Sequence, residues 1–220
     1  MSLRARVFEA LGTVYDPELD EPITTLGFVG SCVVSDDGDV EVRLRLPTPQ
    51  CAPNFAFLMT ADARSAVLRL PEVRDVSVML EDHYTGTEIN AALRRGEGFS
   101  DAFPGETAGG LDALRELFRR KALVAREARL LATVDDPATA TLGELSGPDA
   151  DRCRELRRAL GMDASDHAPA FVKGDGNAVS ADEVARFKRF AGLTALSLET
   201  NGGMCRDLLR VRYDEEGVAA

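Results

Sequence analysis

Cysteines are the residues of this chain whose side chains can do the most chemistry, and the sequence keeps them apart. The four cysteines are Cys32, Cys51, Cys153 and Cys205, and no two of them form a CxxC or CxxxC pair. Such pairs supply the adjacent thiolates of zinc ribbons and of redox-active disulfides. A zinc ribbon is therefore excluded. Cys32 and Cys153 fall in a predicted strand and a predicted helix, where we expect them to be core residues.

Cys51 lies where a predicted strand ends and a predicted helix begins. The alternating run Val40–Leu46 precedes it, and helical spacing starts at Asn54, with several prolines between the two. The positive end of a helix lowers the pKa of a thiol and makes the thiolate, a nucleophile and soft-metal ligand, accessible at neutral pH. We predict a reactive cysteine here. The alternative is a small buried thiol that only packs at the start of the helix.

Three further residues are candidates for the same chemistry. Asp16 precedes Pro17, which disfavours an α conformation, so the carboxylate is expected in a short connection between elements. His83 follows a predicted strand and is a candidate imidazole ligand or acid–base group. Cys205 follows a glycine pair and would join Cys51 as a ligand only if the two halves of the chain pack together.

The elements that must position these residues form a small α+β domain. Apolar residues at helical steps and apolar–polar alternation predict helix, strand, strand, helix and strand over residues 3–14, 23–34, 40–46, 54–70 and 73–80. The turn residues Asp36–Asp39 between the first two strands predict an antiparallel hairpin. This α-β-β-α-β order is typical of a sandwich in which two helices cover one face of a sheet.

A glycine-rich stretch, residues 96–110, is the best candidate for a linker. We therefore predict one domain over residues 1–106 and a mainly helical region over residues 107–220. In that region the patterns predict helices over 111–134, 148–160 and from 180 onward, strands over 170–172 and 193–198, a turn at 201–203, and a helix or strand over 204–213.

The composition of the chain limits the kinds of molecule that it is expected to bind. The chain of 220 residues has 26 basic and 37 acidic residues, a net charge of −11 that repels nucleic acid and anionic lipid. No apolar run has the length of a membrane span, and the N-terminus lacks the apolar core of a signal peptide. We predict a cytoplasmic protein that binds neither nucleic acid nor membrane.

Two motifs, in this order, resemble the iron–sulfur cluster assembly family of the SufT and PaaD type. The first is VYDPE at residues 14–18 and the second is TPQC at residues 48–51, and the resemblance extends over residues 3–106. It implies an α+β domain whose reactive cysteine delivers or receives iron–sulfur clusters beside an acidic motif. The residues expected at the site are Cys51, Asp16, Thr48 and Glu18, with Cys51, Asp16 and His83 as metal ligands.

The chemistry of these residues agrees with what the resemblance implies. A hard carboxylate beside a soft thiolate offers a mixed, incomplete ligand shell that holds iron or an iron–sulfur cluster transiently. The cluster would be shared with a client metalloenzyme, with another assembly protein or with the second subunit of a homodimer. PaaD-like relatives accompany oxygenases, so an oxygenase-type client recognised by residues 107–220 is implied. We expect a maturation factor rather than an enzyme.

Two alternatives remain open at the level of sequence. In the first, Cys51 is the nucleophile of an enzyme and His83 is its base, which requires the imidazole to lie within hydrogen-bonding distance of the sulfur. In the second, the protein is a metal-free scaffold that binds partners through the basic helix at residues 111–134, with Arg119, Arg120 and Arg126 as contact residues.

Overall fold

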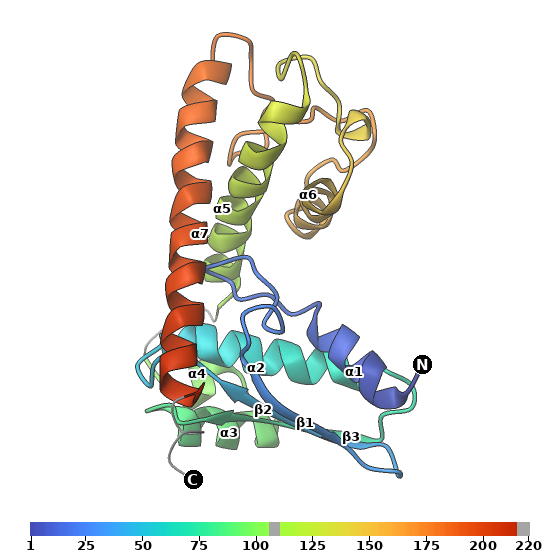
Figure 1. The fold of residues 1–220 in the computed structure, drawn as a ribbon, viewed down its shortest axis with the longest axis vertical. Helices are drawn as coiled ribbons and strands as arrows, with labels where there is room; N and C mark the ends of the chain where they lie inside the picture. The colour runs from blue at the N-terminus through green and yellow to red at the C-terminus, as the bar shows by residue number, and fades with distance from the viewer. Residues whose placement is uncertain (106–110, 215–220) are drawn as a thin grey trace. The chain divides into compact units, whose positions relative to one another are not determined.

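The computed structural model of the chain describes residues 1–105 and 111–214 (Figure 1). They divide into two compact units. Unit 1 consists of Met1–Asp112 together with the C-terminal segment from Gly202, and unit 2 consists of Ala113–Asn201. The predicted boundary at residue 106 lies outside the described residues.

Unit 1 is built on a three-stranded sheet in the order β1-β2-β3. The strands are β1 (Val29–Val34), β2 (Asp39–Arg45) and β3 (Asp75–Glu81). β1 and β2 form the predicted antiparallel hairpin, whereas β2 and β3 are parallel and paired without interruption along their whole length. Alternation turns every second side chain of β2 and β3 toward the core. These buried residues are Val40, Val42, Leu44, Val76, Val78 and Leu80.

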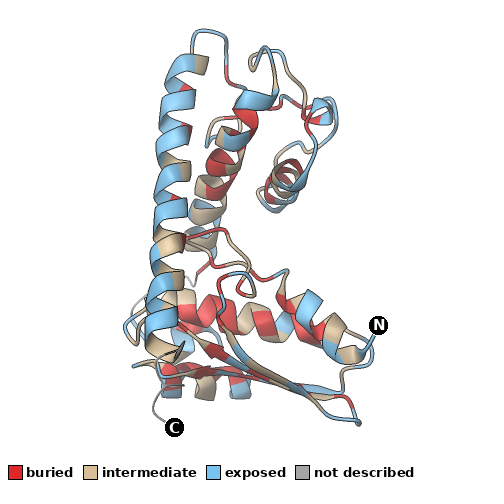
Figure 2. Ribbon diagram, viewed as in Figure 1, coloured by how far each residue is buried: buried red, intermediate tan, exposed pale blue. Residues whose placement is uncertain are grey.

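Two helices, α1 (Leu3–Leu11) and α2 (Pro53–Leu68), cover one face of this sheet (Figure 1). The Ser2 hydroxyl caps α1 by accepting the Ala5 N–H, and Pro53 opens α2, where its missing N–H costs nothing. Figure 2 shows buried positions along most of α2. The predicted order of helices and strands and the α+β class are confirmed.

Two helices that the sequence patterns did not predict follow β3. They are α3 (Gly86–Arg95) and the short α4 (Phe99–Ala102). α3 lies along the free edge of β3, where the Asn90 side-chain amide accepts the Leu80 N–H and donates to the Leu80 carbonyl, both at 2.9 Å. At this position the amide takes the place of a neighbouring strand, because it satisfies both backbone groups of Leu80 on the edge. The buried residues of α3 with helical spacing are Ile89, Ala92 and Leu93.

Unit 2 is helical, as predicted for the second part of the chain. It contains most of α5 (Asp112–Leu130), all of α6 (Pro148–Ala159) and the first part of α7 (Val184–Asp214), with two short 3₁₀ helices, Leu131–Thr133 and Leu142–Glu144, between α5 and α6. Among the described residues, no helix combines the length and the apolar character that a membrane crossing requires.

Three predictions for the second half are wrong. Residues 193–198 and 201–203 are neither a strand nor a turn, because α7 continues through both, and residues 170–172 form only an isolated bridge between Val172 and Ala178. The apolar residues of 193–198 also recur at helical steps, so a window of six residues cannot distinguish the two structures. Residues 204–213 are helical, which was one of the two alternatives.

A buried ion pair joins α5 to α6 in unit 2. The side chains of Glu127 and Arg157 are 0% and 1% exposed, and the guanidinium lies 2.8 Å from the carboxylate. Arg157 also donates to the carbonyls of Pro169 and Ala170, while Glu127 accepts the Val172 N–H. Burial raises the pKa of Glu127, and the charge of Arg157 opposes that rise. The pair therefore fixes the segment at 169–172 against two helices.

We predict that Arg157→Met lowers the free energy of unfolding of unit 2 by about 3–5 kcal/mol, because the Glu127 carboxylate stays buried without its partner. Urea denaturation followed by circular dichroism measures this loss. Arg158→Met, on an exposed position of the same helix, is the matched control and should change stability by less than about 0.5 kcal/mol. Equal effects of the two variants would contradict the prediction.

Candidate functional site

The parallel pairing of β2 with β3 brings two loops to the same end of the sheet. Parallel strands run in one direction, so the segments that follow them leave from one edge. The loop after β2 contains Thr48 and Cys51, and the loop after β3 contains His83. The loops are joined directly, because the Tyr84 N–H donates to the Pro49 carbonyl at 3.1 Å.

Cys51 is a free, half-buried thiol at the junction of β2 and α2. Its sulfur lies 3.5 Å from the hydroxyl oxygen of Thr48, and its N–H donates to the Thr48 carbonyl at 3.4 Å. Two residues later Pro53 begins α2. Cys51 is therefore not among the fully buried residues of the core.

His83 holds the backbone of the Cys51 loop. Its Nδ1 accepts the Thr85 N–H at 3.3 Å and lies 3.1 Å from the Thr85 hydroxyl. Nε2 therefore carries the proton and donates to the Cys51 carbonyl at 2.7 Å. Burial lowers the pKa of His83, the bond to Cys51 opposes this, and the charge of Arg212 lowers the pKa further. In this arrangement a neutral imidazole supports the loop through a carbonyl and makes no hydrogen bond to the sulfur.

Asp16 organises the turn that carries the acidic motif. Its Oδ1 accepts the N–H groups of Glu18 and Leu19 at 2.8 and 2.9 Å. The backbone closes the same turn, because the Asp16 N–H donates to the Glu21 carbonyl and the Asp20 N–H donates to the Asp16 carbonyl, both at 2.9 Å. The Asp16 carboxylate thus closes the turn formed by its own motif.

Asp16 is 7% exposed, and this burial is the largest influence on the pKa of its carboxyl group. Burial raises its pKa to about 6, two backbone N–H bonds oppose the rise, and the charges of Glu18 and Glu21 add to it. The second oxygen, Oδ2, accepts no hydrogen bond from the described residues and is not fully buried. Asp16 therefore has one oxygen engaged in the fold and one available.

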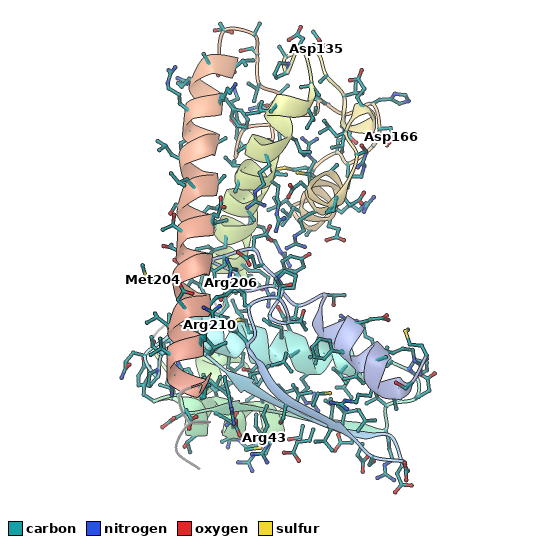
Figure 3. The ribbon with its side chains drawn as sticks, in the orientation of Figure 1. Arg43, Asp135, Asp166, Met204, Arg206 and Arg210 are labelled. Atoms are coloured by element: carbon teal, nitrogen blue, oxygen red, sulfur yellow. The ribbon has the colours of Figure 1, made fainter. Side chains whose placement is uncertain are left out.

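The last turns of α7 also reach this part of unit 1. Arg206 pairs with Glu21 beside the turn after α1 (Figure 3). Arg212 donates to the Leu46 carbonyl at 3.0 Å and to the Asp82 carbonyl at 2.7 Å, the residues directly after β2 and β3. One guanidinium thus ties together the starts of both loops. No local pattern could reveal these contacts, because their partners lie more than a hundred residues away.

The predicted ligands do not make a complete cage. Within residues 1–105 and 111–214, no group of three or more His, Cys, Asp or Glu side chains is gathered so that it could hold a metal ion. The assignment of Cys51, Asp16 and His83 as ligands remains a prediction.

We predict that Asp16→Asn removes a pH dependence of stability. The native pKa of about 6 exceeds the unfolded value of 3.8, so the contribution of Asp16 is fully present below pH 4 and is lost as pH rises through 6. That loss is of the order of 1–3 kcal/mol. The amide oxygen of Asn keeps the bonds to Glu18 and Leu19, so the variant should gain stability relative to wild type as pH rises.

Urea denaturation of both proteins between pH 4 and pH 7.5 measures this difference. Asp37→Asn in the exposed hairpin turn is the control, and its stability should follow wild type. Parallel profiles for wild type and Asp16→Asn would show that the burial of this carboxylate has no energetic consequence.

We also predict that His83→Ala accelerates alkylation of Cys51 several-fold, because the loop loses the bond to its carbonyl and opens more often. Mass spectrometry of the Cys51 peptide after timed exposure to iodoacetamide measures the rate. His167→Ala, which removes the exposed histidine of unit 2, should leave the rate unchanged. An unchanged rate in His83→Ala would mean that the loop is held by its other contacts alone.

Comparisons with known proteins show which part of this chain has relatives. Residues 4–80, all within unit 1, match the family described as iron–sulfur cluster assembly protein. An uncharacterized protein of Methanocaldococcus jannaschii is 33% identical over 97 residues, which are 44% of this chain and the whole of that protein. The Fe-S protein maturation auxiliary factor YitW of Bacillus subtilis is 31% identical over 77 residues, 35% of this chain and 74% of that protein.

A longer relative shares only this domain. The iron-sulfur cluster carrier protein of Deinococcus radiodurans is 40% identical over 73 residues, 33% of this chain, and the match spans 20% of the length of that carrier. The similarity thus spans all of one small protein, about three quarters of another and one part of a larger one. From these matches, the chain belongs to the iron–sulfur cluster assembly protein family.

Proposed function

We propose that this chain delivers iron or iron–sulfur clusters to a metalloenzyme and holds its cargo transiently with Cys51 and Asp16. The observation that carries the proposal is the free, half-buried Cys51 thiol in a loop fixed from three sides, by Thr48, His83 and the start of α2. A thiolate is the ligand that iron–sulfur clusters use most. Membership of the iron–sulfur cluster assembly family supports iron or an iron–sulfur cluster as the cargo.

Thr48 and Glu18 support the two ligands in this proposal. The Thr48 hydroxyl lies within hydrogen-bonding distance of the Cys51 sulfur, and such outer contacts tune the affinity of a ligand for metal. The Glu18 N–H binds Asp16 Oδ1 and thereby leaves Oδ2 for the cargo. Both residues act through the ligands that they contact.

An incomplete set of protein ligands favours transfer of the cargo over its storage. Iron–sulfur clusters in stable sites have four protein ligands, whereas Cys51 and Asp16 supply two. The remaining positions would be filled by the recipient, by another assembly protein or by a second copy of the chain. The recipient then gains ligands as this protein loses them, and the cargo moves without a free intermediate.

We propose unit 2 as the part that recognises the client. It lies outside the family match, which ends at residue 80, and α7 exposes large apolar side chains there. These residues are Phe190, Leu193 and Leu196. A cytoplasmic, oxygenase-type metalloenzyme is the client that the resemblance to PaaD implies. The Arg120 and Arg126 side chains of the basic helix bind Glu116, the Gly174 carbonyl and Asp149 within unit 2, which gives the metal-free scaffold no support.

The proposal predicts that Cys51→Ser slows transfer of a reconstituted cluster to an apo-ferredoxin by at least about tenfold, since the variant lacks the thiolate ligand. Anaerobic transfer followed by the visible circular dichroism of the acceptor measures the rate. Cys32→Ser, a half-buried thiol on β1, is the matched control and should transfer as wild type does. Transfer by Cys51→Ser at the wild-type rate would refute the proposed role.

A further inference from the structure

One face of the last turns of α7 lies against the loops of unit 1 that form the site. A Cβ atom added to Gly202 would come within 2.5 Å of the Glu21 carboxylate, so the helix backbone meets the turn after Asp16 directly. One added to Gly27 would lie 3.2 Å from the Leu209 side chain. Arg212 completes the contact through the carbonyls of Leu46 and Asp82. Successive turns of the helix therefore touch first the acidic loop and then the two loops at the sheet end.

Cys205 belongs to this face by helical spacing. It stands three residues after Gly202, four before Leu209 and seven before Arg212, and residues at these steps share one side of a helix. The neighbouring Arg206 pairs with Glu21 and fixes the rotation of the helix at this turn. The Cys205 thiol is free and half-buried, unlike Cys153, which is 0% exposed in the core of unit 2.

The electrostatics of Cys205 agree with this placement. Burial raises the pKa of its thiol to about 11, and the next contributions come from the negative charges of Asp16, Cys51 and Glu18. These three residues belong to the proposed site. Arg206 opposes the rise.

We propose that Cys205 is the second thiol of the site, so that Cys51 and Cys205 together bind one soft metal ion or one iron of a cluster. This inference rests on the proposed function and adds a ligand from outside the family-matched residues. Two thiolates are half of the set that holds a stable cluster. On binding, the S–H bond of Cys205 breaks, a sulfur–metal bond forms and the proton passes to solvent. No oxidant or reductant is needed.

Cadmium titration of the reduced full-length protein tests this inference, because the ultraviolet absorbance of a thiolate–cadmium bond counts the thiolates bound per metal. We expect wild type to give the signal of two thiolates, and Cys51→Ser and Cys205→Ser each to give about half of it. Cys32→Ser, the matched control, should equal wild type. Thermal melting followed by circular dichroism checks that the variants are folded.

The outcomes separate the two proposals. A wild-type signal in Cys205→Ser, together with a lowered signal in Cys51→Ser, would overturn the role of Cys205 and leave the proposed function intact. A wild-type signal in Cys51→Ser, or no signal in wild type, would overturn the proposed function and the inference with it. A halved signal in both single variants and none in the double variant would establish the two-thiol site.

Discussion

The site depends on the parallel pairing of β2 with β3. Because the two strands are paired along their whole length and run in one direction, the Cys51 loop and the His83 loop must leave the sheet at the same end. His83 then reaches the Cys51 carbonyl, and Arg212 can bind the backbone at the start of both loops. An antiparallel third strand would place these two loops at opposite ends of the sheet and separate His83 from Cys51.

The second constraint is the burial of Asp16. A carboxylate that forms a turn through one oxygen and keeps the other unbonded carries a desolvation cost, which appears as a raised pKa. Such a group gains when a cation approaches it, because the cation offsets that cost. The Asp16 carboxylate thus closes the turn after α1 and remains sensitive to the charges around it.

The first part of α7 belongs to unit 2, and its last turns belong to unit 1, where they contact the loops of the site. Gly202 looks like a turn residue, yet it is helical, and its missing side chain lets the helix approach Glu21. The segment from Gly202 onward is far outside the family match, but its contacts join three loops of the matched domain. The residues outside the family match therefore contribute to unit 1 as well as forming unit 2.

By itself the sequence determined the α-β-β-α-β order, the family, and the position of Cys51 at a strand-to-helix junction, because each depends on periodicity or on residues within a few positions of one another. Tertiary structure alone decided the rest. The hydrogen bond from the His83 imidazole to the Cys51 carbonyl, the cover of the sheet edge by α3 through Asn90, and the contacts of Arg206 and Arg212 with the loops of unit 1 depend on partners distant in the chain. Contacts of that kind arise from packing the whole domain, and no local pattern of residues encodes them.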